Sequence, residues 1–217
     1  MDFELNVADI AILFFLTLGP LKAILPFARV THGTDLAFRR SVAWRATAIA
    51  TAIVLGVALL GPFVLTNWHV SPPAIAITCG IILFYQALRI IMQTPAGALG
   101  SAGRETSQSP PSLAIAVFPL AIPALVTAPG IAAIAAIGVL NRHDLAHQAV
   151  VVALLLGVMA LNLVILWNTE AILKRSAAGV SLVIGWVLAV LQASLAVQIV
   201  IHSLRVLEVL RWPASQG

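Results

Sequence analysis

The chain has 217 residues, of which 61% are hydrophobic and only 9% are charged, whereas about 25% of the residues in an ordinary soluble domain are charged. Such a composition excludes a water-soluble fold, because so much apolar surface could not be hidden from water. The net charge of +4 indicates contact with membrane surfaces rather than with nucleic acid, because most of the basic residues flank apolar segments.

Six apolar segments follow one another along the chain, and each is long enough to cross about 30 Å of hydrocarbon as a helix. They are Ala8–Val30, Ala46–Thr66, Ala74–Met92, Leu113–Leu140, Gln148–Trp167 and Ala178–Ile201. The first differs from a cleaved signal peptide, because Asp2 and Glu4 precede it and no basic residue does. The sequence therefore predicts an all-α polytopic membrane protein with six transmembrane helices and almost no soluble domain.

Prolines interrupt the first and the fourth segments at similar positions. They are Pro20 and Pro26 in the first segment and Pro119 and Pro123 in the fourth. Residues 1–103 and 113–217 each carry three segments, and a linker at 104–112 joins the two halves. Because three crossings bring a chain out on the opposite side, the halves are predicted to form an inverted repeat, in which paired broken helices point to a transporter binding site. Simple proline kinks are the alternative.

The candidate substrate site lies where the fourth segment is broken. Pro119, Pro123 and Pro129 lack an amide hydrogen, so each frees a carbonyl group that hydrocarbon cannot satisfy. Where a helix restarts, its free amides can hold a carboxylate or a phosphate. Gly130 allows a ligand to approach the backbone closely, and Thr127 adds a hydroxyl group. A tight helix reversal inside the bilayer, without any ligand, is the structural alternative.

Polar side chains in other segments are further candidates for binding a zwitterionic or hydroxylated solute. They are Gln86, Asn162 and Gln198. Hydrogen bonds between helices explain them as well, at up to about 2 kcal/mol each. Lys22 is more unusual, because it lies 14 residues after Ala8 in the first segment, and a buried lysine costs at least about 2.5–3.5 kcal/mol. Its side chain either extends to the membrane surface or attracts an anion or carries a proton.

The sequence contains no recognisable catalytic, metal-binding or cofactor-binding motif. The five histidines lie in or near predicted connections without metal-ligand spacing, and the single cysteine leaves neither a disulfide framework nor a zinc cluster. A phosphate-binding glycine loop and a serine nucleophile elbow are also missing. We therefore expect neither an enzyme nor a bound cofactor.

The fourth segment contains Pro119-Leu120-Ala121-Ile122-Pro123 and then Ala128-Pro129-Gly130. This string resembles the signature of the MarC family of six-span integral membrane proteins, and the likeness covers nearly the whole chain. The resemblance implies a location in a bacterial-type cytoplasmic (inner) membrane. It also implies a relation to transporters of small neutral amino acids and to the exporters grouped with lysine efflux proteins.

Three functions from different classes remain open at this point. The first is a secondary transporter that exports small amphiphilic solutes such as neutral amino acids. The second is a lipid or lipid-phosphate translocase, and the third is a non-transporting membrane scaffold. The expected partners are therefore a small-molecule solute or lipid and the surrounding membrane lipids, and not nucleic acid. The sequence leaves homo-oligomer formation open.

The distribution of basic residues predicts that both termini are extracytoplasmic. If six spans alternate, eight Lys and Arg residues fall on one side and three on the other, and the positive-inside rule makes the richer side cytoplasmic. A reporter fused to the C terminus should therefore be active if it works only outside the cytoplasm, and silent if it works only inside. Clear cytoplasmic activity would contradict the six-span assignment or its orientation.

Overall fold

The computed structural model describes residues 7–19, 21–92, 116–140, 145–175 and 178–209. Within these ranges every regular element is a helix and no strand occurs. The elements are α1 (Val7–Leu18), α2 (Leu21–Val30), α3 (Leu36–Asn67), α4 (Pro72–Met92), η2 (Val117–Leu125), α6 (Ala128–Leu140), α7 (Leu145–Trp167), α8 (Thr169–Arg175) and α9 (Ala178–Val206). The all-α prediction is confirmed.

Four of these helices, α3, α4, α7 and α9, are long and apolar enough to cross a membrane, whereas α1 and α6 are apolar but shorter. The membrane prediction is confirmed, but several predicted bounds were too narrow. Helix α3 begins at Leu36, ten residues before the second predicted segment. The hydropathy pattern misses these ten residues because they contain three arginines, although they still form helix. The linker predicted at 104–112 lies outside the described residues.

The first predicted segment is divided into two helices, α1 and α2, which meet at Gly19. A Cβ atom at Gly19 would overlap the backbone oxygen of Phe15, so only glycine fits where α1 ends. Pro26 lies inside α2. The chain is therefore broken in the membrane-spanning part of the first half, as the prolines predicted.

The fourth predicted segment is also broken, but not at Pro129. It consists of η2, which is kinked because Phe118 and Ile122 have extended backbone conformations, and of α6, which begins at Ala128. The prediction that Pro129 interrupts the helix is wrong. Pro129 lies in the first turn of α6, where a helix needs no amide hydrogen and tolerates proline.

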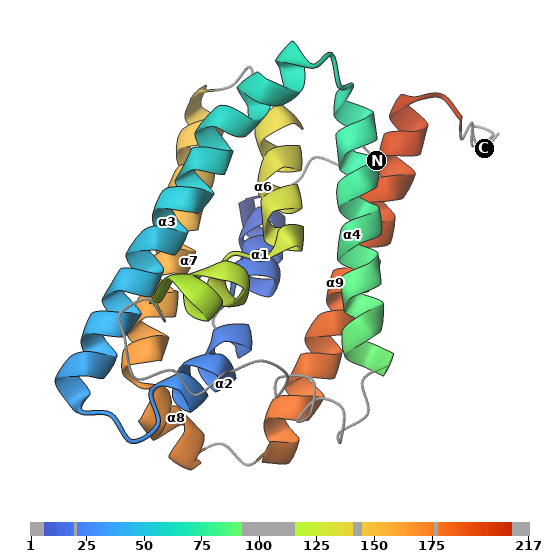
Figure 1. The fold of residues 1–217 in the computed structure, drawn as a ribbon. Coiled ribbons are helices and arrows are strands. Elements are labelled where there is room, and N and C mark those ends of the chain that lie inside the picture. Colours follow the sequence, from blue (N-terminus) through green and yellow to red (C-terminus); the bar gives the residue numbers. More distant parts are fainter. Residues whose placement is uncertain (1–6, 20, 93–115, 141–144, 176–177, 210–217) are drawn as a thin grey trace.

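The helices form two outer pairs around a broken centre. Figure 1 shows α3 and α7 on one side of the molecule, α4 and α9 on the other, and α1 and α6 between them. Helix α6 packs against α1, α3 and α4, and η2 packs against α2 and α3. One hydrophobic core joins these helices and includes the fully buried Phe14, Leu83, Ile134 and Leu155.

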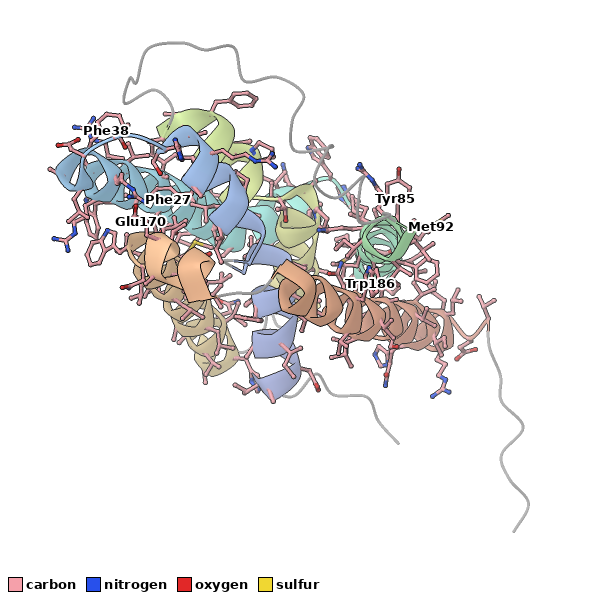
Figure 2. All side chains as sticks on the ribbon, turned by 90° about the horizontal axis from the view of Figure 1, so that it is seen from below. Phe27, Phe38, Tyr85, Met92, Glu170 and Trp186 are labelled. Carbon is pink, nitrogen blue, oxygen red and sulfur yellow. The ribbon has the colours of Figure 1, made fainter. Side chains whose placement is uncertain are left out.

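The long helices expose many large apolar side chains on their outward faces, as contact with lipid favours. On α4, Tyr85 is 63% exposed and Met92 is 78% exposed, whereas Phe27 of α2 is only 1% exposed. Figure 2 shows the two α4 side chains pointing away from the rest of the molecule. This distribution supports a bundle whose outer surface faces lipid.

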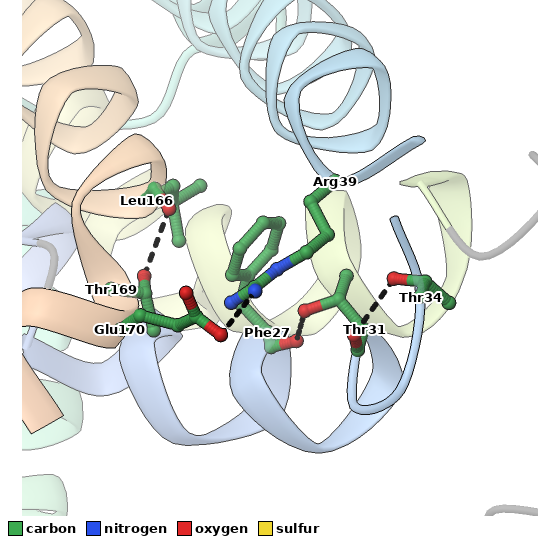
Figure 3. A network of polar contacts seen from close by, with 7 residues as sticks. All are labelled: Phe27, Thr31, Thr34, Arg39, Leu166, Thr169 and Glu170. Carbon is green, nitrogen blue, oxygen red and sulfur yellow. Dashed lines mark hydrogen bonds and ion pairs between the residues drawn. The ribbon is translucent and has the colours of Figure 1, made fainter. Parts of the chain in front are cut away.

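A small polar network lies at the end of the molecule where α2 ends and α3 and α8 begin (Figure 3). Arg39 of α3 pairs with Glu170 of α8 at 2.6 Å. The Thr31 hydroxyl donates to the Phe27 carbonyl at 2.7 Å, and the Thr169 hydroxyl caps α7. Because the Glu170 side chain is 55% exposed, the ion pair contributes at most about 1 kcal/mol.

Helices α4 and α9 approach each other closely at Gly80. A Cβ atom there would lie 2.5 Å from Val200 Cγ2 and 2.9 Å from the Ala196 oxygen, so Gly80→Ala must push the two helices apart. We expect a loss of about 1–3 kcal/mol in the free energy of unfolding, measured as a lower midpoint of thermal unfolding in detergent. The matched control is Gly185→Ala on α9, where a Cβ would meet nothing within 4 Å. Equal midpoints for the two variants would contradict the close packing.

Candidate functional site

The carboxyl end of α1 and the amino end of α6 meet inside the bundle. Thr127 immediately precedes α6, and its hydroxyl donates a hydrogen bond to the Thr17 carbonyl at 2.9 Å. The same hydroxyl oxygen accepts a hydrogen bond from the Gly130 amide at 3.1 Å. Thr127 is thus the N-cap of α6 and also satisfies a carbonyl group that the end of α1 leaves without a helical partner. We call this contact the junction.

Asn162 of α7 completes the junction from a third helix. Its Nδ2 donates to the Leu18 carbonyl at 2.8 Å and to the Val158 carbonyl at 3.1 Å, and its side chain is fully buried. Its Oδ1 is also buried and has no hydrogen-bond partner among the described residues. A buried unpartnered acceptor costs about 1–3 kcal/mol. This oxygen is therefore a strong candidate for contact with a solute.

The junction presents both signs of partial charge within a short distance. A helix carries a partial negative charge at its carboxyl end and a partial positive charge at its amino end. The end of α1 and the start of α6 therefore offer opposite electrostatic environments, and Thr127 joins them directly. A molecule with both an ammonium and a carboxylate group would match this arrangement.

Leu18 fills the space that Gly130 leaves open. A Cβ atom at Gly130 would overlap the Leu18 side chain, which is itself 1% exposed. In this conformation it is therefore Leu18 of α1, and not a ligand, that lies close to the Gly130 backbone. Binding of a ligand at Gly130 stays a prediction. A ligand could reach the first turn of α6 only after Leu18 moves.

The structure brings only some of the predicted site residues together. Thr127, Pro129 and Gly130 lie at the start of α6, and Asn162 contacts the same place from α7. Pro20 lies outside the described residues, as do the side chains of Lys22 and Pro119. Lys22 begins α2 together with Leu21, so its backbone directly follows the break.

The remaining predicted residues lie on other elements. Pro26 is inside α2, and Pro123 is exposed in η2. Gln86 lies on α4, and its Oε1 is buried without a hydrogen-bond partner in the described part of the chain. Gln198 is on the exposed face of α9 and lines a hollow that shares no residue with the junction.

Two residues of the junction, Thr17 and Leu18, were not predicted from the sequence. They contribute backbone carbonyl groups, which no side-chain pattern reveals. The signal that could have identified them is Gly19-Pro20, since a helix that ends there leaves the carbonyls of the preceding turn without partners. Among the described residues no group of three or more His, Cys, Asp or Glu side chains could hold a metal ion.

The Thr127 hydroxyl should be needed for stability, because its removal leaves both the Thr17 carbonyl and the Gly130 amide without this partner. Thr127→Val keeps the shape of the side chain and should lower the free energy of unfolding by about 1–3 kcal/mol. Thr127→Ser retains the hydroxyl and serves as the control. Thermal unfolding in detergent distinguishes the two variants, and equal stability would show that the hydroxyl makes no net contribution.

Comparison with known proteins places the chain in a family. The model of the family described as MarC family integral membrane protein matches residues 6–207. The chain is also 29% identical over 169 residues to a UPF0056 membrane protein of Buchnera aphidicola subsp. Schizaphis graminum (strain Sg), a match that covers 78% of this chain and 81% of that protein. No solved structure matches the chain. The family match spans both broken helices and all the long helices, and the chain belongs to the MarC family of integral membrane proteins.

Proposed function

We propose that this protein is a secondary transporter that exports small amphiphilic solutes such as neutral amino acids. The observation that carries the proposal is the junction, where two helix ends of opposite polarity meet beside the unpartnered Oδ1 of Asn162. Broken helices whose ends face a buried site are the arrangement by which many transporters bind substrates within the membrane. The junction is thus the proposed substrate site.

The chemistry of the junction favours a zwitterion. The α-ammonium group of an amino acid would bind at the carboxyl end of α1, where the carbonyl groups of Thr17 and Leu18 each keep a second lone pair. Its carboxylate would bind at the first turn of α6, near Gly130. Asn162 Oδ1 would accept a further hydrogen from the ammonium group or from a side-chain hydroxyl. Each group of the solute then has a partner of opposite polarity.

The packing of the helices supports an inverted repeat of six crossings. In this proposal α1 and α2 correspond to η2 and α6, α3 corresponds to α7, and α4 corresponds to α9. Two pairs of contacts are consistent with this correspondence: α1 packs on α6 as η2 packs on α2, and α1 packs on α7 as η2 packs on α3. Movement of one half against the other would open the junction to each side of the membrane in turn.

Lys22 is proposed to belong to the same site. It lies four residues after Leu18, at the start of α2, so the chain break places it next to the junction in sequence. A buried ammonium group needs water, carbonyl oxygens or an anion, and the break supplies carbonyl groups. Lys22 would then attract the carboxylate of the solute or carry a proton.

Flux into proteoliposomes tests the proposal directly. The purified chain should transport at least one neutral amino acid from a labelled panel, and lipid phosphates should not move. Transport of lipid phosphates alone would favour the translocase alternative. If the folded protein transported no member of the panel, the transporter proposal would be contradicted in favour of a scaffold.

In the same assay Lys22→Met removes the charge while it preserves most of the stem. Flux of the transported solute should fall about tenfold or more, which corresponds to about 1.4 kcal/mol. The yield of folded protein should be unchanged or higher, because a desolvated charge is removed. Lys174→Met in α8 is the control for loss of a lysine outside the site. Undiminished flux of well-folded Lys22→Met would show that Lys22 has no part in transport.

A further inference from the structure

The exposed face of α9 carries a polar stripe at the end of the helix. It consists of Ser194, Gln198, His202 and Arg205, whose spacing of four, four and three residues places them on one helix face. Together with Phe84 of α4 and the apolar α9 residues between them, they line a hollow of about 560 Å³. None of the residues of the junction lines this hollow.

The hollow extends from the end of the membrane span towards its interior. Arg205 lies in the last turn of α9, where a helix long and apolar enough to cross a membrane ends at Val206, so we place the guanidinium group at the membrane boundary. Ser194 lies 11 residues earlier, which is about 16 Å deeper along a helix. Helix α9 packs along α4 and touches α1, and the stripe residues Ser194, Gln198 and Arg205 are exposed.

Two of these four polar side chains lack partners among the described residues. The Ser194 hydroxyl donates to the Val190 carbonyl at 3.0 Å, whereas the side chains of Gln198 and Arg205 make no hydrogen bond or ion pair with the described residues. His202 makes a contact of its own, and Glu208 does not line the hollow. An exposed amide at membrane depth is costly unless a molecule other than hydrocarbon hydrogen-bonds to it.

We propose that this hollow binds an anionic phospholipid. Arg205 binds the phosphate at the membrane boundary, because a guanidinium group forms paired hydrogen bonds to phosphate oxygens. Gln198 lies about one helical turn below His202, at the depth of the glycerol esters, and its amide donates to an ester carbonyl. The acyl chains pack against Phe84, Val197 and Ile201, which are the apolar part of the lining.

The charge of the site explains why the lipid is anionic. Arg205 is a cation without an acidic partner among the described residues, and an arginine near a membrane surface attracts anionic lipid. A zwitterionic lipid would bring its own cation next to the guanidinium group. The inference is independent of the proposed transport function, because the two sites have no residue in common.

Lipid binding to the full-length protein tests the proposal. Native mass spectrometry from detergent would compare phosphatidylglycerol with phosphatidylcholine of the same acyl chains, and the wild-type protein should bind phosphatidylglycerol about tenfold more tightly. Arg205→Gln should abolish this preference, and Gln198→Leu should weaken binding of both lipids several-fold. The matched control is Arg89→Gln, which removes another exposed arginine from the last turn of a long apolar helix, α4. This control should retain the preference.

Three outcomes would overturn the proposal. One is equal affinity of the wild-type protein for the two lipids. A second is equal loss of preference in Arg205→Gln and Arg89→Gln, since the effect would then come from overall charge. The third is efficient disulfide formation between copies in native membranes when Gln198→Cys is introduced into a Cys79→Ala background, because a second copy of the chain would then occupy the hollow.

Discussion

Every backbone hydrogen-bonding group inside a bilayer must find its partner within the protein, and this constraint determines the centre of the structure. Helix α1 ends at Leu18 in the interior of the bundle, so its last carbonyl groups need donors from elsewhere. Thr127 and Asn162 supply those donors from α6 and α7. The broken helix is therefore stable only together with the helices that surround it, and its end is held in a defined place.

The same constraint separates structural from functional groups at the junction. Three backbone groups already have hydrogen-bond partners within the protein, so their burial requires no ligand. They are the carbonyl groups of Thr17 and Leu18 and the amide of Gly130. Asn162 differs because its Nδ2 is satisfied and its Oδ1 is not. A purely structural asparagine could be replaced by a residue with fewer buried acceptors at lower cost. The unused acceptor is thus the feature of the junction that packing alone does not explain.

Much of the architecture could be predicted from the sequence, because hydrophobic length and proline are local signals. The long apolar segments became helices, and both proline-rich segments are broken. Extended backbone at Phe118 and Ile122 confirms the breaks predicted at Pro119 and Pro123. A break at Pro129 was predicted wrongly, since proline is compatible with the first turn of α6. The hydrogen bonds of the junction could not be predicted from local sequence patterns. They join Thr127 to Thr17 across 110 residues and Asn162 to Leu18 across 144.

The Thr127 hydroxyl has a further consequence, because it has a single hydrogen. That hydrogen is directed to the Thr17 carbonyl, so it cannot be shared fully with a second acceptor. A carboxylate oxygen that arrives at the start of α6 and takes this hydrogen deprives the end of α1 of its donor at the same moment. The ligand would then bind, and the end of α1 would be released, when the Thr127 hydroxyl changes its acceptor from the Thr17 carbonyl to the carboxylate. One threonine thereby makes the two broken helices respond to each other.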